Sequence, residues 1–151
     1  MVDEEYIVRE EAWEKYGVFL DTASDRKLVT ELNLADKGIA DLTPLAKLTS
    51  LTKLDLYKNQ ITDLAPLTGL VRLEELGLGS NQITDLTPLA GLISLRELRL
   101  YSNEITDLTP LTGLKQLEQL NLEDNPNLAG AQIDNLKRPM PKCRIVHNAK
   151  S

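Results

Sequence analysis

Apolar residues recur with a fixed period of 22 residues along most of this 151-residue chain. Three twelve-residue stretches are nearly identical, and each begins 22 residues after the one before it. They read NQITDLAPLTGL at 59–70, NQITDLTPLAGL at 81–92 and NEITDLTPLTGL at 103–114. A period of about 20 to 50 residues is typical of proteins that are built from stacked structural repeats.

Each period follows the template LxxLxLxxNxITDLxPLxxLxx, which combines two kinds of spacing. The segment LxL alternates apolar and polar positions, as a short strand with one buried face does. The segment PLxxL has the spacing of a tight helical turn, and proline favours the first position of such a turn. Each unit therefore runs out as a strand and returns through a turn. The units are 29–50, 51–72, 73–94, 95–116 and an incomplete fifth from Leu117.

A single unit of 22 residues cannot bury its leucines, but stacked units bury them against one another. The strands of such a stack lie in parallel, about 4.8 Å apart. Aromatic residues make up only 4% of the chain, so the core is expected to be aliphatic. We predict one structural domain, an α/β repeat solenoid, with the repeats over 28–126 between two terminal caps.

Asparagine stands where the later units leave their strands. A buried asparagine at this place bonds to backbone N–H and C=O groups of neighbouring coils and satisfies them inside the stack. Lys37 occupies the same position in the first unit. A polar ladder that binds a ligand is the alternative interpretation. The residues concerned are Asn59, Asn81, Asn103 and Asn125.

Aspartate precedes each turn by two residues, a place where carboxylates accept hydrogen bonds from backbone N–H groups. Threonine stands directly before the proline in three units, where we interpret it as a helix cap. Calcium requires about six to eight oxygen ligands. One carboxylate per coil supplies too few, so we expect no metal and no cofactor. The aspartates are Asp41, Asp63, Asp85 and Asp107, and the threonines are Thr43, Thr87 and Thr109.

The repeated string closely resembles the 22-residue leucine-rich repeats of bacterial proteins of the internalin type. The resemblance covers about residues 28–126. It implies a horseshoe-shaped solenoid with a concave parallel sheet and with 3₁₀ or extended segments on the convex side. It also implies recognition of a protein through the concave face.

Both ends of a solenoid expose leucines unless they are capped. Residues 1–27 are predicted to form a helical N-terminal cap, with Tyr6, Trp13 and Tyr16 on one face of a helix over 3–16. Residues 127–151 are predicted to form a C-terminal cap and tail. Within them we expect a short helix over 129–137, with Ile133 and Leu136 inward, and a last strand in the segment CRIVH.

The net charge of −6 argues against nucleic acid as the main ligand. No apolar run reaches the length of a membrane span. The acidic start MVDEEYIVREEAWEKYG lacks the order of a secretory signal, so we expect a cytoplasmic monomer, or a secreted one if a signal has been removed.

The single cysteine and the single histidine, Cys143 and His147, are a candidate nucleophile and base. In a strand they would lie about 13 Å apart, which is too far for a hydrogen bond. No phosphate loop, zinc spacing or acid pair is present in the sequence. We therefore expect no enzymatic activity.

Outward positions of the predicted strands are free to vary, and they carry the candidate binding residues. Tyr57 and Tyr101 flank Gly79, while Asp55 and Arg99 flank Gly77. Because Gly77 and Gly79 occupy outward positions of one strand and have no side chains, they predict an open notch one coil wide. The tyrosines on either side of it are expected to lie about 10 Å apart, which is two strand spacings. The candidate partner-binding residues are Tyr57, Gly77, Gly79, Tyr101, Asp55, Arg99, Lys53, Glu75 and Glu97.

Three functions are compatible with this sequence. The first is a non-enzymatic module that binds an unknown protein on its concave face, since tyrosine and arginine are enriched among interface hot spots. The second is a structural, engineered or consensus scaffold without an evolved ligand, which the near-identity of units two to four suggests. The third is carbohydrate binding in the notch between Tyr57 and Tyr101.

Deletion of residues 1–27 is expected to uncover the leucines of the first unit and to cause association or partial unfolding. Light scattering after size-exclusion chromatography and thermal melting measure the two effects. A truncated chain that stays monomeric and melts like the parent would show that this segment is a dispensable tail.

Overall fold

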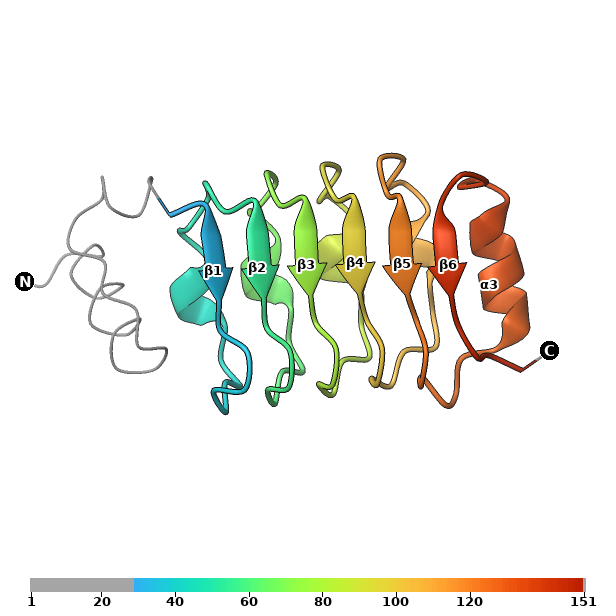
Figure 1. The fold of residues 1–151 in the computed structure, drawn as a ribbon, viewed down its shortest axis with the longest axis horizontal. Coiled ribbons are helices and arrows are strands. Elements are labelled where there is room, and N and C mark those ends of the chain that lie inside the picture. Colours follow the sequence, from blue (N-terminus) through green and yellow to red (C-terminus); the bar gives the residue numbers. More distant parts are fainter. Residues whose placement is uncertain (1–28, 151) are drawn as a thin grey trace, which may run out of the picture.

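Six short strands form one parallel sheet in chain order (Figure 1), in a computed structural model that describes residues 29–150. The predicted N-terminal helix and its aromatic residues lie outside the described part. Between neighbouring repeats, each strand residue pairs with the residue 22 positions later, as Leu32 does with Leu54. The predicted register is therefore confirmed. The strands are β1 Glu31–Asn33, β2 Lys53–Asp55, β3 Glu75–Gly77, β4 Glu97–Arg99, β5 Gln119–Asn121 and β6 Arg144–Val146.

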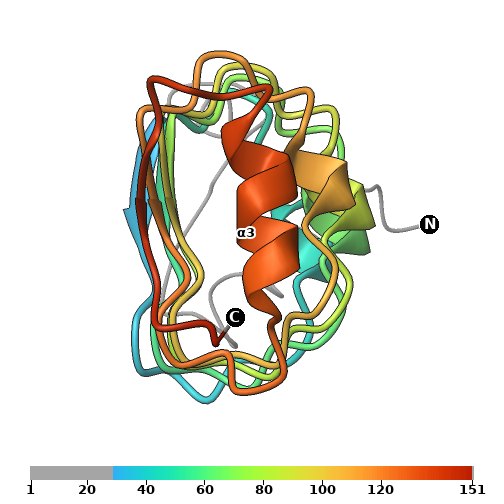
Figure 2. The ribbon, with the colours of Figure 1, turned by 90° about the vertical axis from the view of Figure 1, so that its right-hand side faces the viewer.

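One turn of 3₁₀ helix forms the opposite side of each complete coil (Figure 2). Proline lies in its first turn, where a backbone N–H has no partner within the helix and its loss costs little. The turns are η1 Thr43–Leu45, η2 Ala65–Leu67, η3 Thr87–Leu89 and η4 Thr109–Leu111. A parallel sheet with 3₁₀ turns on its other side is the solenoid that the sequence predicts.

The interpretation of the threonines as helix caps is wrong. In each turn the capping position lies one residue before the expected one and is occupied by a leucine, which makes no side-chain cap bond. Leu86, the residue before Thr87, is an example. The N–H of Thr87 instead donates to Oδ1 of Asp85 at 2.9 Å. Hydrogen bonds from the side chain and the backbone of Thr87 hold the pKa of Asp85 below its usual value. The aspartates therefore bind the start of each turn, as predicted. Thr87 and Thr109 add a side-chain hydrogen bond to Asp85 and Asp107.

Leucine and isoleucine fill the space between the sheet and the 3₁₀ turns as one continuous cluster. Leu54, Leu76 and Leu98 point inward from consecutive strands and are at most 2% exposed. Aromatic residues take no part in this cluster among the described residues. The aliphatic core is therefore confirmed within residues 29–150.

The asparagine ladder is confirmed by the bonds of its buried amides. Oδ1 of Asn81 accepts the N–H of Ile61, in the preceding coil, at 3.0 Å. Its Nδ2 donates to the carbonyls of Leu56, also in the preceding coil, and of Leu78, in its own coil. Equivalent bonds recur at Asn103. Because these bonds occupy the amides inside the stack, the ladder is structural.

A left-handed residue precedes each ladder position, which the sequence analysis did not predict. Their φ angles lie between 55° and 58°, although none of them is glycine. The N–H of Lys58, for example, donates to the carbonyl of Gly79 in the next coil at 2.9 Å. Stacking bonds of this kind offset the cost of the left-handed conformation, which is about 1–2 kcal/mol. The residues are Asp36, Lys58, Ser80, Ser102 and Asp124.

A helix and a strand close the C-terminal end, as the sequence predicts. The helix α3, Gly130–Lys137, crosses the end of the last coil between the sheet and η4 (Figure 2). Its residues Ile133 and Leu136 are each 1% exposed. Oε1 of Gln132 accepts the N–H of Leu108 at 3.0 Å. The helix thus covers leucines and supplies an acceptor where the repeats end.

Replacing Asn81 by leucine is expected to lower the free energy of unfolding by about 1–3 kcal/mol, because buried backbone groups lose their partners. The exposed neighbour provides a matched control, and Gln82→Ala should change stability by no more than about 0.5 kcal/mol. Urea denaturation measures both variants. Coincident midpoints for Asn81→Leu and the parent would rule out a stabilising ladder.

Candidate partner-binding face

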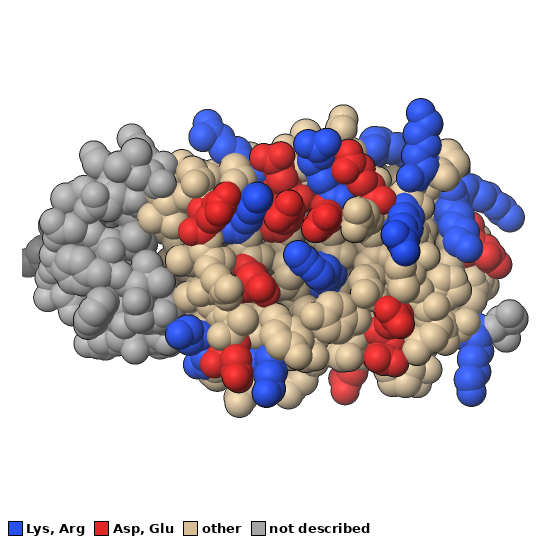
Figure 3. All heavy atoms as spheres, in the orientation of Figure 1, with Lys and Arg blue, Asp and Glu red and all other residues tan. Residues whose placement is uncertain are grey.

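Many charges on the outward face of the sheet lie in a band over the beginnings of the strands, and others lie nearer the strand ends (Figure 3). Lys53 on β2 lies between two carboxylates, with Nζ 3.7 Å from Glu31 and 3.9 Å from Glu75. On β4, Arg99 lies 3.7 Å from Glu97. Exposed ion pairs contribute only about 0–1 kcal/mol each. These pairs therefore shape the charge pattern of the face more than they stabilise the fold.

The two tyrosines lean toward each other over the strand that separates them. Their ring centroids are 6.1 Å apart and the ring planes are tilted by 45°. The predicted separation of about 10 Å is wrong, because it describes strand spacing and ignores the direction of the side chains. Contact between aromatic rings at this distance is favourable, and it closes the space above Gly79.

Gly79 provides the surface on which the Tyr101 ring lies. A Cβ atom at Gly79 would collide with the ring of Tyr101, because it would lie closer to that ring than real contacts allow. Gly79 and Gly77 are both buried. The expectation of an open notch above Gly79 is therefore wrong, and the glycine is needed for the tyrosine pair.

The notch persists only above Gly77, where it forms part of a larger hollow. A Cβ atom at Gly77 would lie 2.9 Å from Oδ1 of Asp55, and this oxygen accepts the N–H of Tyr57 at 3.0 Å. The hollow has a volume of about 410 Å³ and extends over β1, β2 and β3. Its charged lining residues are Glu31, Lys53, Asp55, Glu75 and Arg99.

A second hollow of about 260 Å³ lies over β4, β5 and β6. Glu97, Arg99 and Arg144 supply its charges, and Gln119 and Asn121 supply amides. Arg99 lines both hollows and therefore marks the boundary between them. Sequence reasoning missed this hollow, because Arg144 enters the sheet from the C-terminal cap and not from a repeat.

The two tyrosines differ in exposure and in environment. Tyr57 is 38% exposed, whereas Tyr101 is half-buried. Burial raises the pKa of Tyr101 above its usual value, and Tyr57 and Asp55 add to this effect while Arg99 opposes it. The Tyr101 phenol is therefore neutral at neutral pH, and its hydroxyl is able both to donate and to accept a hydrogen bond.

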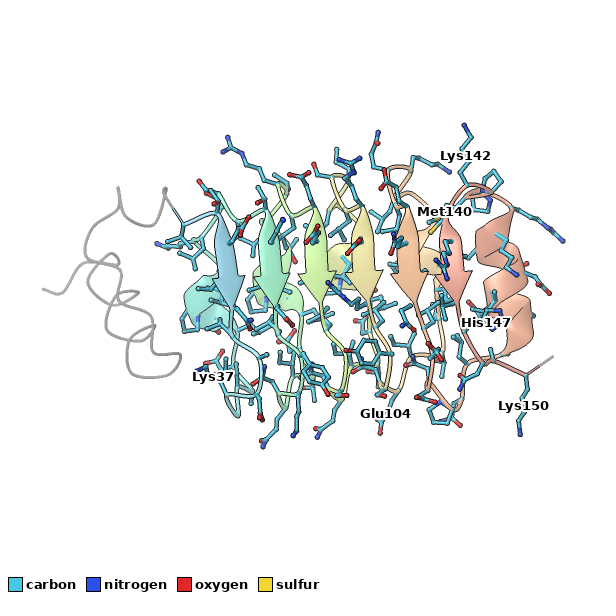
Figure 4. The ribbon with its side chains drawn as sticks, viewed as in Figure 1. Lys37, Glu104, Met140, Lys142, His147 and Lys150 are labelled. Carbon is cyan, nitrogen blue, oxygen red and sulfur yellow. The ribbon has the colours of Figure 1, made fainter. Side chains whose placement is uncertain are left out.

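The candidate nucleophile and base have other partners. Burial raises the pKa of the Cys143 thiol, which disfavours the nucleophilic thiolate. Nδ1 of His147, which lies just after β6 (Figure 4), accepts the N–H of Ala149 at 3.2 Å. Within residues 29–150, no group of three His, Cys, Asp or Glu side chains forms a metal site. No helix in this part of the chain is long and apolar enough to cross a membrane.

The family profile described as "Leucine Rich repeats (2 copies)" matches residues 27–69, 49–91 and 93–138. The chain belongs to the leucine-rich repeat family. Its repeats are of the internalin type, and both the sequence and the fold are similar to those of solved internalins. No curated protein sequence matches the chain.

An internalin (InlF) from Listeria monocytogenes is 32% identical, with a TM-score of 0.82 over 95% of this chain and 42% of its own. Internalin C2 from the same organism is 32% identical, with a TM-score of 0.70 over 85% of this chain and 57% of its own. A leucine-rich repeat protein from Leptospira interrogans is 29% identical, with a TM-score of 0.60 over 80% and 38%. The chain thus spans about half the length of the internalins that it matches.

Replacing Gly79 by alanine tests the tyrosine pair through a double-mutant cycle. The φ of Gly79 is not left-handed, so alanine at this position should stabilise a Tyr101→Ala background by about 0.4–1 kcal/mol. When Tyr101 is present, the new Cβ collides with its ring, so Gly79→Ala should give no such stabilisation. The coupling energy between Gly79→Ala and Tyr101→Ala should then be at least about 0.5 kcal/mol. Urea unfolding of the four proteins measures it. Equal effects of Gly79→Ala in both backgrounds would show that the ring does not lie on Gly79.

Proposed function

We propose that this leucine-rich repeat domain is a non-enzymatic module that binds a protein partner on the outward face of its sheet. The observation that carries the proposal is the tyrosine pair above Gly79. Aromatic anchors near the centre of a surface are characteristic of interface hot spots. Leucine-rich repeat domains are generally binding modules, and stacked repeats present an extended surface for this purpose.

The pair is suited to binding because it is ordered before a partner arrives. Each tyrosine ring is held by the other, and Tyr101 also rests on Gly79. A side chain that is already fixed loses less conformational entropy on binding. Hollows lie beside the pair, so a partner's side chains have space to enter the surface.

The tyrosine geometry does not favour a sugar held between the two rings. Contacts on both faces of a sugar would require the rings to be about 7–8 Å apart, at about 3.5–4 Å per contact. The observed rings are 6.1 Å apart and tilted by 45°. We therefore favour a protein partner over a carbohydrate.

Photo-crosslinking in cells that express the chain tests the location of the partner. A benzophenone amino acid in place of Tyr57 should form a covalent adduct with a cellular protein. The matched control replaces Ile93, which is 62% exposed but lies on the loop between η3 and β4, and it should form no such adduct. Adducts from Ile93 alone would show that the partner binds at the loops and not at the outward face of the sheet. Adducts from neither position would favour a scaffold without a ligand.

For the partner identified by the adduct, Tyr57→Ala should weaken binding about 30-fold, which corresponds to a hot-spot loss of about 2 kcal/mol. Ile93→Ala should leave the affinity within about twofold of the parent. Isothermal titration calorimetry measures both variants. An unchanged affinity for Tyr57→Ala would exclude the tyrosine as an anchor.

A further inference from the structure

The two hollows of the sheet face differ in the sign of their charge. Arg99 borders both of them, but it is paired with Glu97 at 3.7 Å. Glu97 lines only the hollow over β4, β5 and β6, so the pair adds no net charge there, whereas Arg99 counts as a cation of the hollow over β1, β2 and β3. The remaining side chains therefore decide which kind of group each hollow accepts.

The hollow over β1, β2 and β3 is acidic. Its lining residues include three carboxylates, those of Glu31, Asp55 and Glu75. The cations among its lining residues are Lys53 and Arg99. Lys53 is shared between Glu31 and Glu75. The three carboxylates outnumber the two cations, Lys53 and Arg99, so a cationic side chain from a partner is attracted to this hollow.

The hollow over β4, β5 and β6 is basic. Beyond the pair of Arg99 and Glu97, Arg144 is its charged lining residue, and the uncharged amides of Gln119 and Asn121 complete its polar surface. Lys142 and Lys150 lie toward opposite ends of the same C-terminal coil (Figure 4). An anionic side chain is therefore attracted to this hollow.

The spacing of the hollows limits what kind of segment reaches both. The acidic hollow extends over β1 to β3 and the basic one over β4 to β6. Their centres, near β2 and β5, are three strand spacings or about 14 Å apart. An extended chain rises about 3.4 Å per residue, and alternate side chains share a face. Four residues of extended chain therefore span the distance and return to the same face.

We propose that the partner presents an extended segment that crosses the strands. Its lysine or arginine enters the hollow over β1–β3, and its aspartate or glutamate, four residues away in sequence, enters the hollow over β4–β6. The segment passes above Arg99 and beside the two tyrosines. This inference rests on the proposed function and adds to it the chemistry and the spacing of the recognised segment.

Selection from a phage-displayed library of random linear peptides tests the inference. Peptides enriched on the parent protein should carry a basic residue at one position and an acidic residue four positions before or after it, with three residues between them. On Glu75→Lys the basic residue should be replaced by an acidic or neutral one, and on Arg144→Glu the acidic residue should be replaced likewise. Binding of the parent's peptides should fall about tenfold or more on either variant, because like charges are then opposed.

Two variants with the same charge changes outside the hollows serve as controls. Glu104 and Lys37 lie beyond the ends of the strands (Figure 4), and both are exposed. Glu104→Lys and Lys37→Glu should enrich the same peptides as the parent. Circular dichroism establishes that each variant is folded before selection.

The outcomes separate this inference from the proposed function. Enriched peptides without the charge pair, or with a pair that Glu75→Lys and Arg144→Glu do not alter, overturn the inference. If such peptides still lose binding on Tyr57→Ala, the proposed function stands. If Tyr57→Ala does not weaken them, both are contradicted. A library from which the parent enriches nothing also overturns the inference, because segments with the stated spacing were present.

Discussion

The bonds of the buried asparagines between neighbouring coils are the interaction on which the rest of the structure depends. Each amide joins its own coil to the preceding one and satisfies backbone groups that the turn leaves without partners. A buried group without such a partner costs about 1–3 kcal/mol. The amides therefore make one stacking geometry strongly preferred, and leucines of every coil meet in a single core.

Regular stacking has a consequence for function, because it separates the residues that build the fold from those that face outward. Inward leucines repeat almost without change, whereas outward positions vary from coil to coil. Variation among neighbouring coils is sufficient to make one surface with an acidic hollow, an aromatic pair and a basic hollow. Tyr57, Gly79 and Tyr101 show this most clearly, since the glycine of one coil accommodates the ring of the next.

Two features of the C-terminal segment cover the end of the repeats. Gln132 of α3, in the segment after the last repeat unit, accepts the N–H of Leu108. The strand β6 then extends the sheet and brings Arg144 to its outward face. A segment that closes the core thus also contributes to the candidate binding surface, which is why the cap and the proposed function are linked.

The sequence by itself determined the coils, the strand register, the ladder and the C-terminal cap, because each of these follows from spacings that recur every 22 residues or from a local helical pattern. It did not determine the left-handed conformation of residues such as Lys58 and Ser80, which bonds from the adjacent coil maintain. Only the tertiary structure decided that Tyr101 lies on Gly79 and that Arg144 borders a hollow. The direction of an outward side chain depends on the space that residues 22 positions away leave open, and a pattern of residue types does not specify that space.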